Sequence, residues 1–101
     1  MEDKYSFLKQ HFNSIDKVSV NEGKGAQGIK YRNKMFAMFY KGDLTLQLPP
    51  ERVLEIINNG VGLPHDPGTG KPMKNRVLIP FAKKQHWVAL TEESMRYVMG
   101  I

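Results

Sequence analysis

The sequence contains no cysteine, and this absence removes several kinds of chemistry at once. Without a thiol the chain can form no disulfide, use no thiolate nucleophile and hold no zinc through cysteine ligands. Apolar runs are short, and none approaches the roughly 18 residues that a transmembrane helix needs. The opening residues carry acids where a signal peptide has a positive region and an apolar stretch. We therefore expect a cytoplasmic protein without a membrane segment.

The sequence also lacks the residue patterns that are typical of an enzyme. None of its three histidines belongs to a motif with metal-ligand spacing. His65 and Asp66 are neighbours in sequence, so their side chains diverge. Glu92 and Glu93 would stand about 100° apart on a helix instead of converging on a substrate. We predict a non-enzymatic protein with no catalytic residue, no metal and no cofactor.

Two glycine-rich segments match nucleotide-binding motifs only in part. The segment 23–28 reads G-x-G-x-x-G, but the residues after it are typical of a strand, where a dinucleotide site needs a helix. The segment 68–71 resembles the end of a phosphate-binding loop. However, His65 occupies the position of the first required glycine, and Pro72 replaces the serine or threonine that contacts magnesium. Neither segment predicts nucleotide chemistry.

The 101 residues, 41% of them hydrophobic, are enough for one core, so we expect a single domain over residues 1–101. A first helix, which Asp3 would cap, carries Tyr5, Leu8, Phe12 and Ile15 at helical spacing. Strands are predicted at about 17–22, 29–32, 34–40, 44–48 and 76–81. A second helix begins at Pro50 with an apolar stripe, and a Gly/Pro-rich loop of about fourteen residues follows it. The stripe consists of Val53, Leu54 and Ile57.

A last helix is predicted from about Lys83 to Met99, with Trp87, Leu90, Met95 and Val98 on its apolar side. Consecutive strands with short turns pair antiparallel. The fold class is therefore α+β, a two-layer domain with an antiparallel sheet of about five strands and three helices.

The strand at 34–40 is apolar on both faces. Alternation would place Met35, Ala37 and Phe39 on one face, and Phe36, Met38 and Tyr40 on the other. A two-layer domain covers only one face of its sheet, so the second set is a candidate interface for self-association or for a protein partner. The alternative is that the chain's own helices or the long loop cover it.

Positive charge is unevenly distributed along the chain, whose net charge is +5. Two segments, 24–41 and 68–84, carry five basic residues each and no acid. They are either solvated surface or a site for phosphate or another polyanion. Tyr31, between Lys30 and Arg32, is the one aromatic residue among the candidate contacts on which a base could stack. The candidate anion or nucleic-acid contacts are Lys30, Arg32, Lys34, Lys71, Lys74 and Arg76.

Several short motifs in a fixed order resemble the N-terminal domain of the bacterial TfoX/Sxy family, over about residues 18–99. They are Gly28-Ile29-Lys30, Lys34-Met35-Phe36-Ala37-Met38, Gly42-Asp43-Leu44, Leu48-Pro49-Pro50-Glu51-Arg52-Val53, Asp66-Pro67-Gly68, Gly70, Pro72-Met73-Lys74, and the stretch from Trp87-Val88-Ala89-Leu90 to Tyr97-Val98.

The TfoX/Sxy resemblance implies a two-layer α/β domain with an antiparallel sheet, similar to the YjbR-like and secretion-chaperone-like folds. The family is named for a competence regulator that helps a cyclic-AMP-responsive activator switch on DNA-uptake genes. Full-length regulators of that kind carry a second, helical domain after this one, which this sequence does not contain. No catalytic residue follows from the resemblance.

The functional expectation is a non-enzymatic regulatory or adaptor domain that acts through a protein partner. A transcription or competence regulator is the more specific form of this hypothesis. The alternative is a module that binds nucleic acid or another anionic ligand weakly and without sequence preference.

Overall fold

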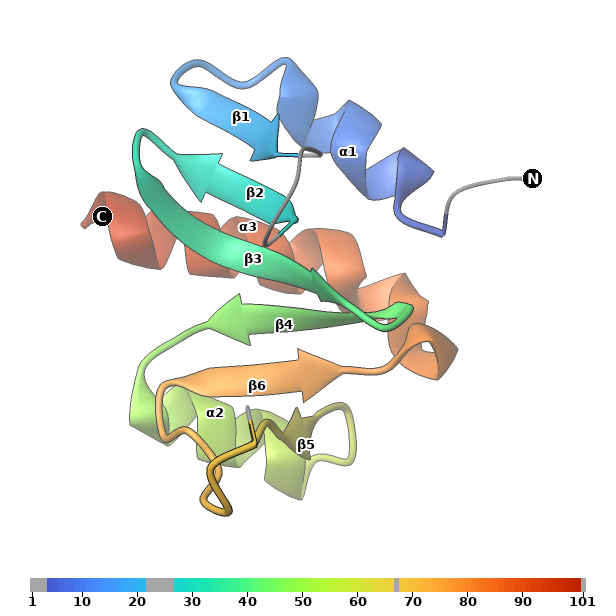
Figure 1. Ribbon diagram of the computed structural model, residues 1–101, viewed down its shortest axis with the longest axis vertical. Helices are drawn as coiled ribbons and strands as arrows, with labels where there is room; N and C mark the ends of the chain where they lie inside the picture. The colour runs from blue at the N-terminus through green and yellow to red at the C-terminus, as the bar shows by residue number, and fades with distance from the viewer. Residues whose placement is uncertain (1–3, 22–26, 67, 101) are drawn as a thin grey trace.

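Six antiparallel strands and three α-helices make up the part of the chain that the computed structural model describes, residues 4–21, 27–66 and 68–100. The sheet order is β1-β2-β3-β4-β6-β5 (Figure 1). The predicted α+β class is confirmed, with six strands instead of about five. Their bounds are α1 Ser6–Asn13, β1 Val18–Asn21, β2 Gly28–Tyr31, β3 Lys34–Tyr40, β4 Asp43–Gln47, α2 Pro50–Asn58, β5 Leu63–Pro64, β6 Arg76–Ile79, the 3-10 helix η1 Phe81–His86 and α3 Trp87–Met99.

The helices lie on one face of the sheet, which is the inner face. Figure 1 shows α3 behind the central strands and α2 behind β6, while α1 packs beside β1 and also contacts α3. The strand registers align Leu44 with Ile79 and Leu46 with Val77. All four side chains are fully buried. The core therefore lies between this row of cross-strand pairs and the helices, as alternation along half-buried strands requires.

A β-bulge in β3 changes which side chains reach the core. Ile29 is opposite Ala37, but Lys30 is opposite Met35, so Phe36 is an extra residue on β3. Such an insertion interrupts the alternation of side chains along a strand. Phe36 and Ala37 are both fully buried, and the Phe36 ring packs edge-on against Phe12 of α1 at 6.2 Å. Phe36 therefore belongs to the core.

The predicted interface of Phe36, Met38 and Tyr40 is wrong for this reason. The chain's own helices cover Phe36, while Met38 and Tyr40 are half-buried on β3. Met38 is opposite Thr45, whose neighbours Leu44 and Leu46 point into the core. The apolar face expected for a partner is thus divided between the two sides of the sheet. The structure offers no contiguous patch made of these three residues.

The last helix begins later than the sequence predicts. Residues Phe81–His86 form a 3-10 helix, and Lys83 inside it has non-helical backbone angles. The α-helix starts at Trp87, whose indole N–H donates a hydrogen bond to the Ile79 backbone oxygen at 3.0 Å. The Asp43 carboxylate accepts a hydrogen bond from the Phe81 N–H at 2.9 Å. These contacts tie the segment after β6 back to the sheet, so a continuous helix from Lys83 does not form.

Two sequence predictions lie outside the described residues: the Asp3 cap of the first helix and most of the glycine segment 23–28. The two-residue strand β5 was not predicted, because Leu63 and Pro64 sit within the expected loop. None of the helices in the described ranges has both the length and the apolar character that a membrane crossing requires.

Candidate functional site

The apolar stripe of α2 is rotated from the one that the sequence predicts. Val53 and Ile56 are the buried residues of this helix, whereas Leu54 is 61% exposed and Ile57 is half-buried. Of the three residues in the predicted stripe, only Val53 is therefore fully inside the core. Val53 and Ile56 are three positions apart, as residues on one helix face must be. Leu54 and Ile57 are also three apart, and they form a second apolar row at the edge of the buried face.

A folded loop lies opposite this second row. β5 pairs with β6, which anchors the start of the loop to the sheet. The Met73 N–H donates a hydrogen bond to the His65 backbone oxygen at 2.9 Å and brings the returning strand of the loop beside the outgoing one. Asp66 Oδ1 accepts hydrogen bonds from the N–H groups of Gly68 and Thr69 at 2.8 and 2.9 Å. The Gly68 bond is the largest of the effects that lower the pKa of Asp66.

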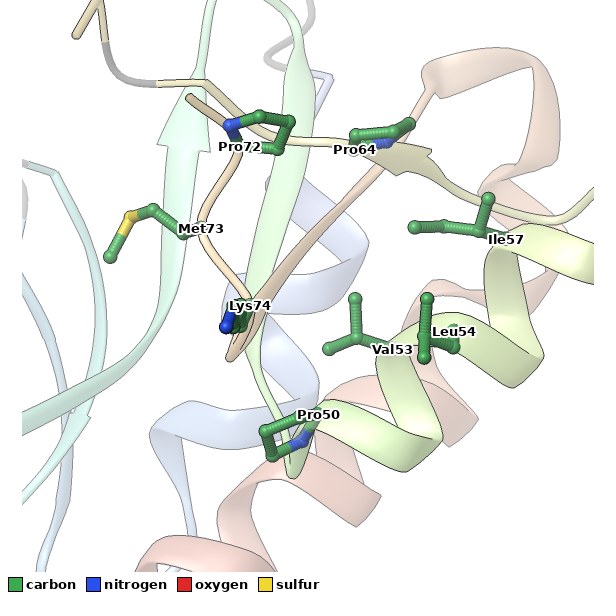
Figure 2. A pocket seen from close by; sticks show the side chains of 8 residues that line it. All are labelled: Pro50, Val53, Leu54, Ile57, Pro64, Pro72, Met73 and Lys74. Carbon is green, nitrogen blue, oxygen red and sulfur yellow. The ribbon is translucent and has the colours of Figure 1, made fainter. Parts of the chain in front are cut away.

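Between α2 and this loop lies an apolar groove with a volume of about 460 Å³. Figure 2 shows the α2 side chains on one wall, with β5 and the returning loop on the other. We call this feature the α2 groove. Its volume lies within the range of ligand pockets. It is lined by Pro50, Val53, Leu54, Ile57, Pro64, Pro72, Met73 and Lys74.

The chemistry of the α2 groove is that of a binding surface. Seven of its eight lining residues are apolar, and Lys74 is the one charged residue among them. Water therefore solvates exposed hydrocarbon in the groove, and an apolar occupant would release it. None of the described residues that line the groove is an acid, a histidine, a serine or a threonine, so they offer hydrophobic contact and, at Lys74, a positive charge.

The sequence analysis did not predict the α2 groove, although it identified the apolar residues of α2 and the loop that form it. Val53, Leu54 and Ile57 were predicted as the apolar stripe of the second helix, and a Gly/Pro-rich loop was predicted after it, but the two were not connected. The available signal was that α2 carries more apolar residues than one buried face of a nine-residue helix can use. The surplus row predicts a surface for something outside the core.

The registers of the sheet bring four of the six predicted anion contacts to one end. Ala37 is opposite Leu46, and Gln47 is opposite Arg76, so the start of β3, the end of β4 and the start of β6 lie together. They lie on the left in Figure 1. Lys34 on β3 and Arg76 on β6 are separated by one strand, β4. We call this group the basic end; it consists of Arg32, Lys34, Lys74 and Arg76.

The members of the basic end form no ion pair with any described residue. The Arg32 guanidinium lies 5.6 Å from the centre of the Tyr31 ring, and Tyr31 itself packs partly into the core. Tyr97, which is 41% exposed, shares a hollow of about 450 Å³ with Lys34 and Gln47. The basic end thus has a second aromatic residue that the sequence did not reveal as its neighbour.

The two remaining predicted contacts lie elsewhere. Lys30 is half-buried in the middle of β2, where it is opposite Met35 and Ser19. Lys71 is exposed in the loop between β5 and β6. The six predicted residues therefore do not form one surface.

The histidines and acids outside the loop form structural pairs. His11 is exposed, and its Nε2 lies 2.6 Å from Glu92 on α3. Glu93 points another way, toward Arg52 of α2. The expected divergence of Glu92 and Glu93 is confirmed. Within the described ranges no three His, Asp or Glu side chains are grouped so that they could hold a metal ion.

The comparisons with known proteins add no relative. No family model, no curated protein and no solved structure matches the chain.

Proposed function

We propose that this protein is a non-enzymatic adaptor or regulatory domain that binds a segment of a partner protein in the α2 groove. The observation that carries the proposal is the exposed row of Leu54 and Ile57 facing the Pro64–Lys74 side of the loop across about 460 Å³ (Figure 2). Exposed hydrocarbon that lies in a concave site and is rimmed by polar residues is typical of an interaction surface. Full burial of one leucine or methionine side chain contributes about 1.5–3 kcal/mol.

The charges around the α2 groove indicate the kind of partner. Lys74 lies within it, Lys71 is exposed on the same loop, and the whole chain has a net charge of +5. The groove has no aromatic lining, unlike the grooves that hold proline-rich peptides. We therefore assign it to a short amphipathic segment that presents aliphatic side chains together with an aspartate or glutamate. The aliphatic groups would fill the groove, and the carboxylate would meet Lys74.

The TfoX/Sxy resemblance stays a prediction, and it supports the same kind of function. A family of regulators that act through a protein partner would need a docking surface on this domain, and the α2 groove provides a candidate. The interface proposed from β3 alone is not carried forward, because Phe36 is buried.

The test is a selection from a random-peptide library, followed by affinity measurements with two matched variants. Leu54→Asn removes an aliphatic side chain from the α2 groove, while Leu63→Asn makes the same change at a leucine that is 53% exposed and does not line it. We expect the selected peptides to be aliphatic and acidic. Their affinity should fall at least ~10-fold for Leu54→Asn and stay within about twofold for Leu63→Asn.

Three outcomes would count against the adaptor proposal. The library might yield no enriched peptide, the enriched peptides might be basic or polar, or both leucine variants might lose affinity equally. Because Leu54 and Leu63 are both largely exposed, neither substitution is expected to change the free energy of unfolding by more than about 0.5 kcal/mol. Loss of binding in Leu54→Asn would therefore report on the groove itself.

A second candidate function is weak, sequence-independent binding of nucleic acid at the basic end. The observation that favours it is the convergence of Arg32, Lys34, Lys74 and Arg76, beside the exposed Tyr97 ring. Cations that track phosphates, together with an aromatic ring on which a base can stack, are the parts of a non-specific single-strand site. Its test is the salt dependence described in the Discussion.

A further inference from the structure

Arg76 stands out among the cations because it is half-buried on the face of the sheet that the helices leave uncovered. It begins β6, and its Nη1 donates a hydrogen bond to Thr45 Oγ1 at 3.4 Å. Thr45 is fully buried and therefore fixes where the guanidinium lies. A guanidinium has five N–H donors. In the described part of the chain, this is its one hydrogen bond and no carboxylate pairs with it.

The environment of Arg76 is unfavourable for a charge without a counter-ion. Burial lowers the pKa of Arg76, which means that the surrounding protein disfavours the charged form. A partly desolvated charge is normally compensated by an opposite charge or by hydrogen bonds. The Arg76 side chain is only partly buried, so part of it stays in contact with solvent.

His65 provides a second group at the same place. Its exposed fraction is only 7%, and its ring packs edge-on against Tyr40 at 5.1 Å. β5 pairs with β6 so that Pro64 is opposite Val77, and His65 follows Pro64 where Arg76 precedes Val77, so the two residues are neighbours across these strands. Burial and then the positive charge of Arg76 lower the pKa of His65. Lys41 Nζ lies 5.2 Å from the centre of the Tyr40 ring and adds another positive charge nearby.

One carboxylate, Asp66, also acts on His65 and favours its protonation. It does not neutralise Arg76, and its Oδ1 is occupied by the N–H groups of Gly68 and Thr69. The described residues therefore supply no anion for Arg76.

We propose that Thr45, His65 and Arg76 form a binding site for inorganic phosphate or a phosphomonoester group, with Thr45 positioning the guanidinium. The fork of N–H donors on Arg76 matches a pair of phosphate oxygens. A third terminal oxygen can accept a hydrogen bond from the His65 ring. A phosphodiester has only two terminal oxygens and one negative charge, so it would fit less well. None of these three residues lines the α2 groove, so this site is independent of the proposed adaptor function.

The site is tested by NMR titration of labelled protein with inorganic phosphate near pH 7, against sodium chloride at matched ionic strength. We expect saturable shifts of the Arg76 side-chain and His65 ring signals with phosphate alone. Arg76→Gln should weaken phosphate binding at least ~10-fold, because a charge-assisted pair of hydrogen bonds is lost. Arg96→Gln is the matched control, since Arg96 is an exposed cation on α3. It should leave the affinity unchanged.

Dimethyl phosphate separates this site from a nucleic-acid backbone. We expect it to bind at least ~10-fold more weakly than phosphate. Equal binding of the diester, equal shifts with chloride, or wild-type affinity in Arg76→Gln would each overturn the proposal. If circular dichroism shows that Arg76→Gln is unfolded, the phosphate affinity of Arg76→Lys tests the proposal instead. That variant keeps the charge but loses the fork, and it should bind phosphate several-fold more weakly.

The histidines give a second readout within the same molecule. Sulfate stays a dianion between about pH 5 and 8, where an unperturbed histidine titrates. Bound sulfate should raise the pKa of His65 above its value in chloride, because an anion favours the imidazolium form. His11, beside Glu92, and His86 serve as internal references. An equal rise for all three histidines, or a rise of His65 that persists in Arg76→Gln, would contradict the site.

Discussion

At the scale of single residues, α3 carries two buried hydroxyl groups with opposite consequences. The Ser94 hydroxyl lies 2.6 Å from the Gln47 backbone oxygen and 3.1 Å from that of Phe36, the extra residue of the β3 bulge. Thr91, one turn earlier, is also fully buried, but its Oγ1 has no hydrogen-bond partner among the described residues. The Ser94 hydroxyl therefore stabilises the sheet at the β3 bulge, whereas the Thr91 hydroxyl is removed from water without gaining a hydrogen bond.

Ser94→Ala and Thr91→Val should therefore change the free energy of unfolding in opposite directions. Removing the Ser94 hydroxyl leaves two backbone oxygens without this donor and should destabilise the fold by about 1–3 kcal/mol. Replacing the Thr91 hydroxyl by a methyl group keeps the side-chain shape and should be neutral or stabilising by up to about 1 kcal/mol. Urea denaturation of both variants measures the difference. A destabilised Thr91→Val would mean that this hydroxyl has a partner, such as an ordered water.

At the scale of elements, α2 and α3 are joined by a paired charge interaction. The Arg52 side chain donates hydrogen bonds to both oxygens of Glu93, from Nε at 2.7 Å and from Nη2 at 3.0 Å. Hydrogen bonding to Glu93 is the largest cause of the raised pKa of Arg52. Glu55, on the same helix as Arg52, also pairs with it. This contact holds α2 in place over the sheet and so supports one wall of the α2 groove.

Glu93→Gln should weaken this junction while leaving the core intact. Both side chains are about one-third exposed (31% and 34%), so solvent screens the pair and we expect a loss of about 0.5–1 kcal/mol in the free energy of unfolding. The loss should shrink in high salt. Glu51→Gln, at an exposed acid in the first turn of α2, is the control and should cost no more than about half as much. A loss that is independent of salt would indicate a packing effect instead.

At the scale of the whole molecule, the basic end lies at one end of the sheet, and η1, which carries Lys83 and Lys84, lies at the other end. Topology produces the basic end, because the antiparallel registers place the β2–β3 turn and the start of β6 at the same end of the sheet. The α2 groove, the basic end and the Arg76 site lie within the part of the domain formed by β3, β4, β6, α2 and the loop. They differ in chemistry, so each predicts a different ligand and a different experimental signature.

Nucleic-acid binding at the basic end should depend on salt in a defined way. If four phosphates are neutralised, log affinity should fall against log salt with a slope of about −2.8 for single-stranded DNA. Arg32→Ala with Lys34→Ala should flatten this slope by about 1.4. Lys83→Ala with Lys84→Ala removes the same charge from η1, at the opposite end of the sheet, and should change the slope little. Fluorescence titrations at several salt concentrations measure all three slopes. Equal flattening by both double variants would show that net charge, and not the basic end, attracts DNA.

The α+β class, most strands and the positions of the three helices were predictable from the sequence. Local patterns decide them: alternation at Leu44, Leu46 and Leu48, the proline at the start of α2, and the 3.6-residue spacing around Trp87. The short turns between β2 and β3 and between β3 and β4 were also predictable from the local sequence. These features depend on residues close in sequence, so a single sequence is enough to predict them.

The tertiary structure alone decided which apolar side chains are buried and which charged groups meet. Because β3 contains one extra residue, Phe36 lies in the core. Because the buried face of α2 is formed by Val53 and Ile56, Leu54 lies outside the core. The bulge has no local signal, and the surplus of apolar residues on α2 does not show which of them stays outside the core. Both results depend on packing against segments far along the chain. Arg76, Thr45 and His65 come together for the same reason. The alternation of a strand and the periodicity of a helix predict how side chains repeat along that element. How the element packs against its neighbours depends on the energy of the whole core, which residues close in sequence do not determine.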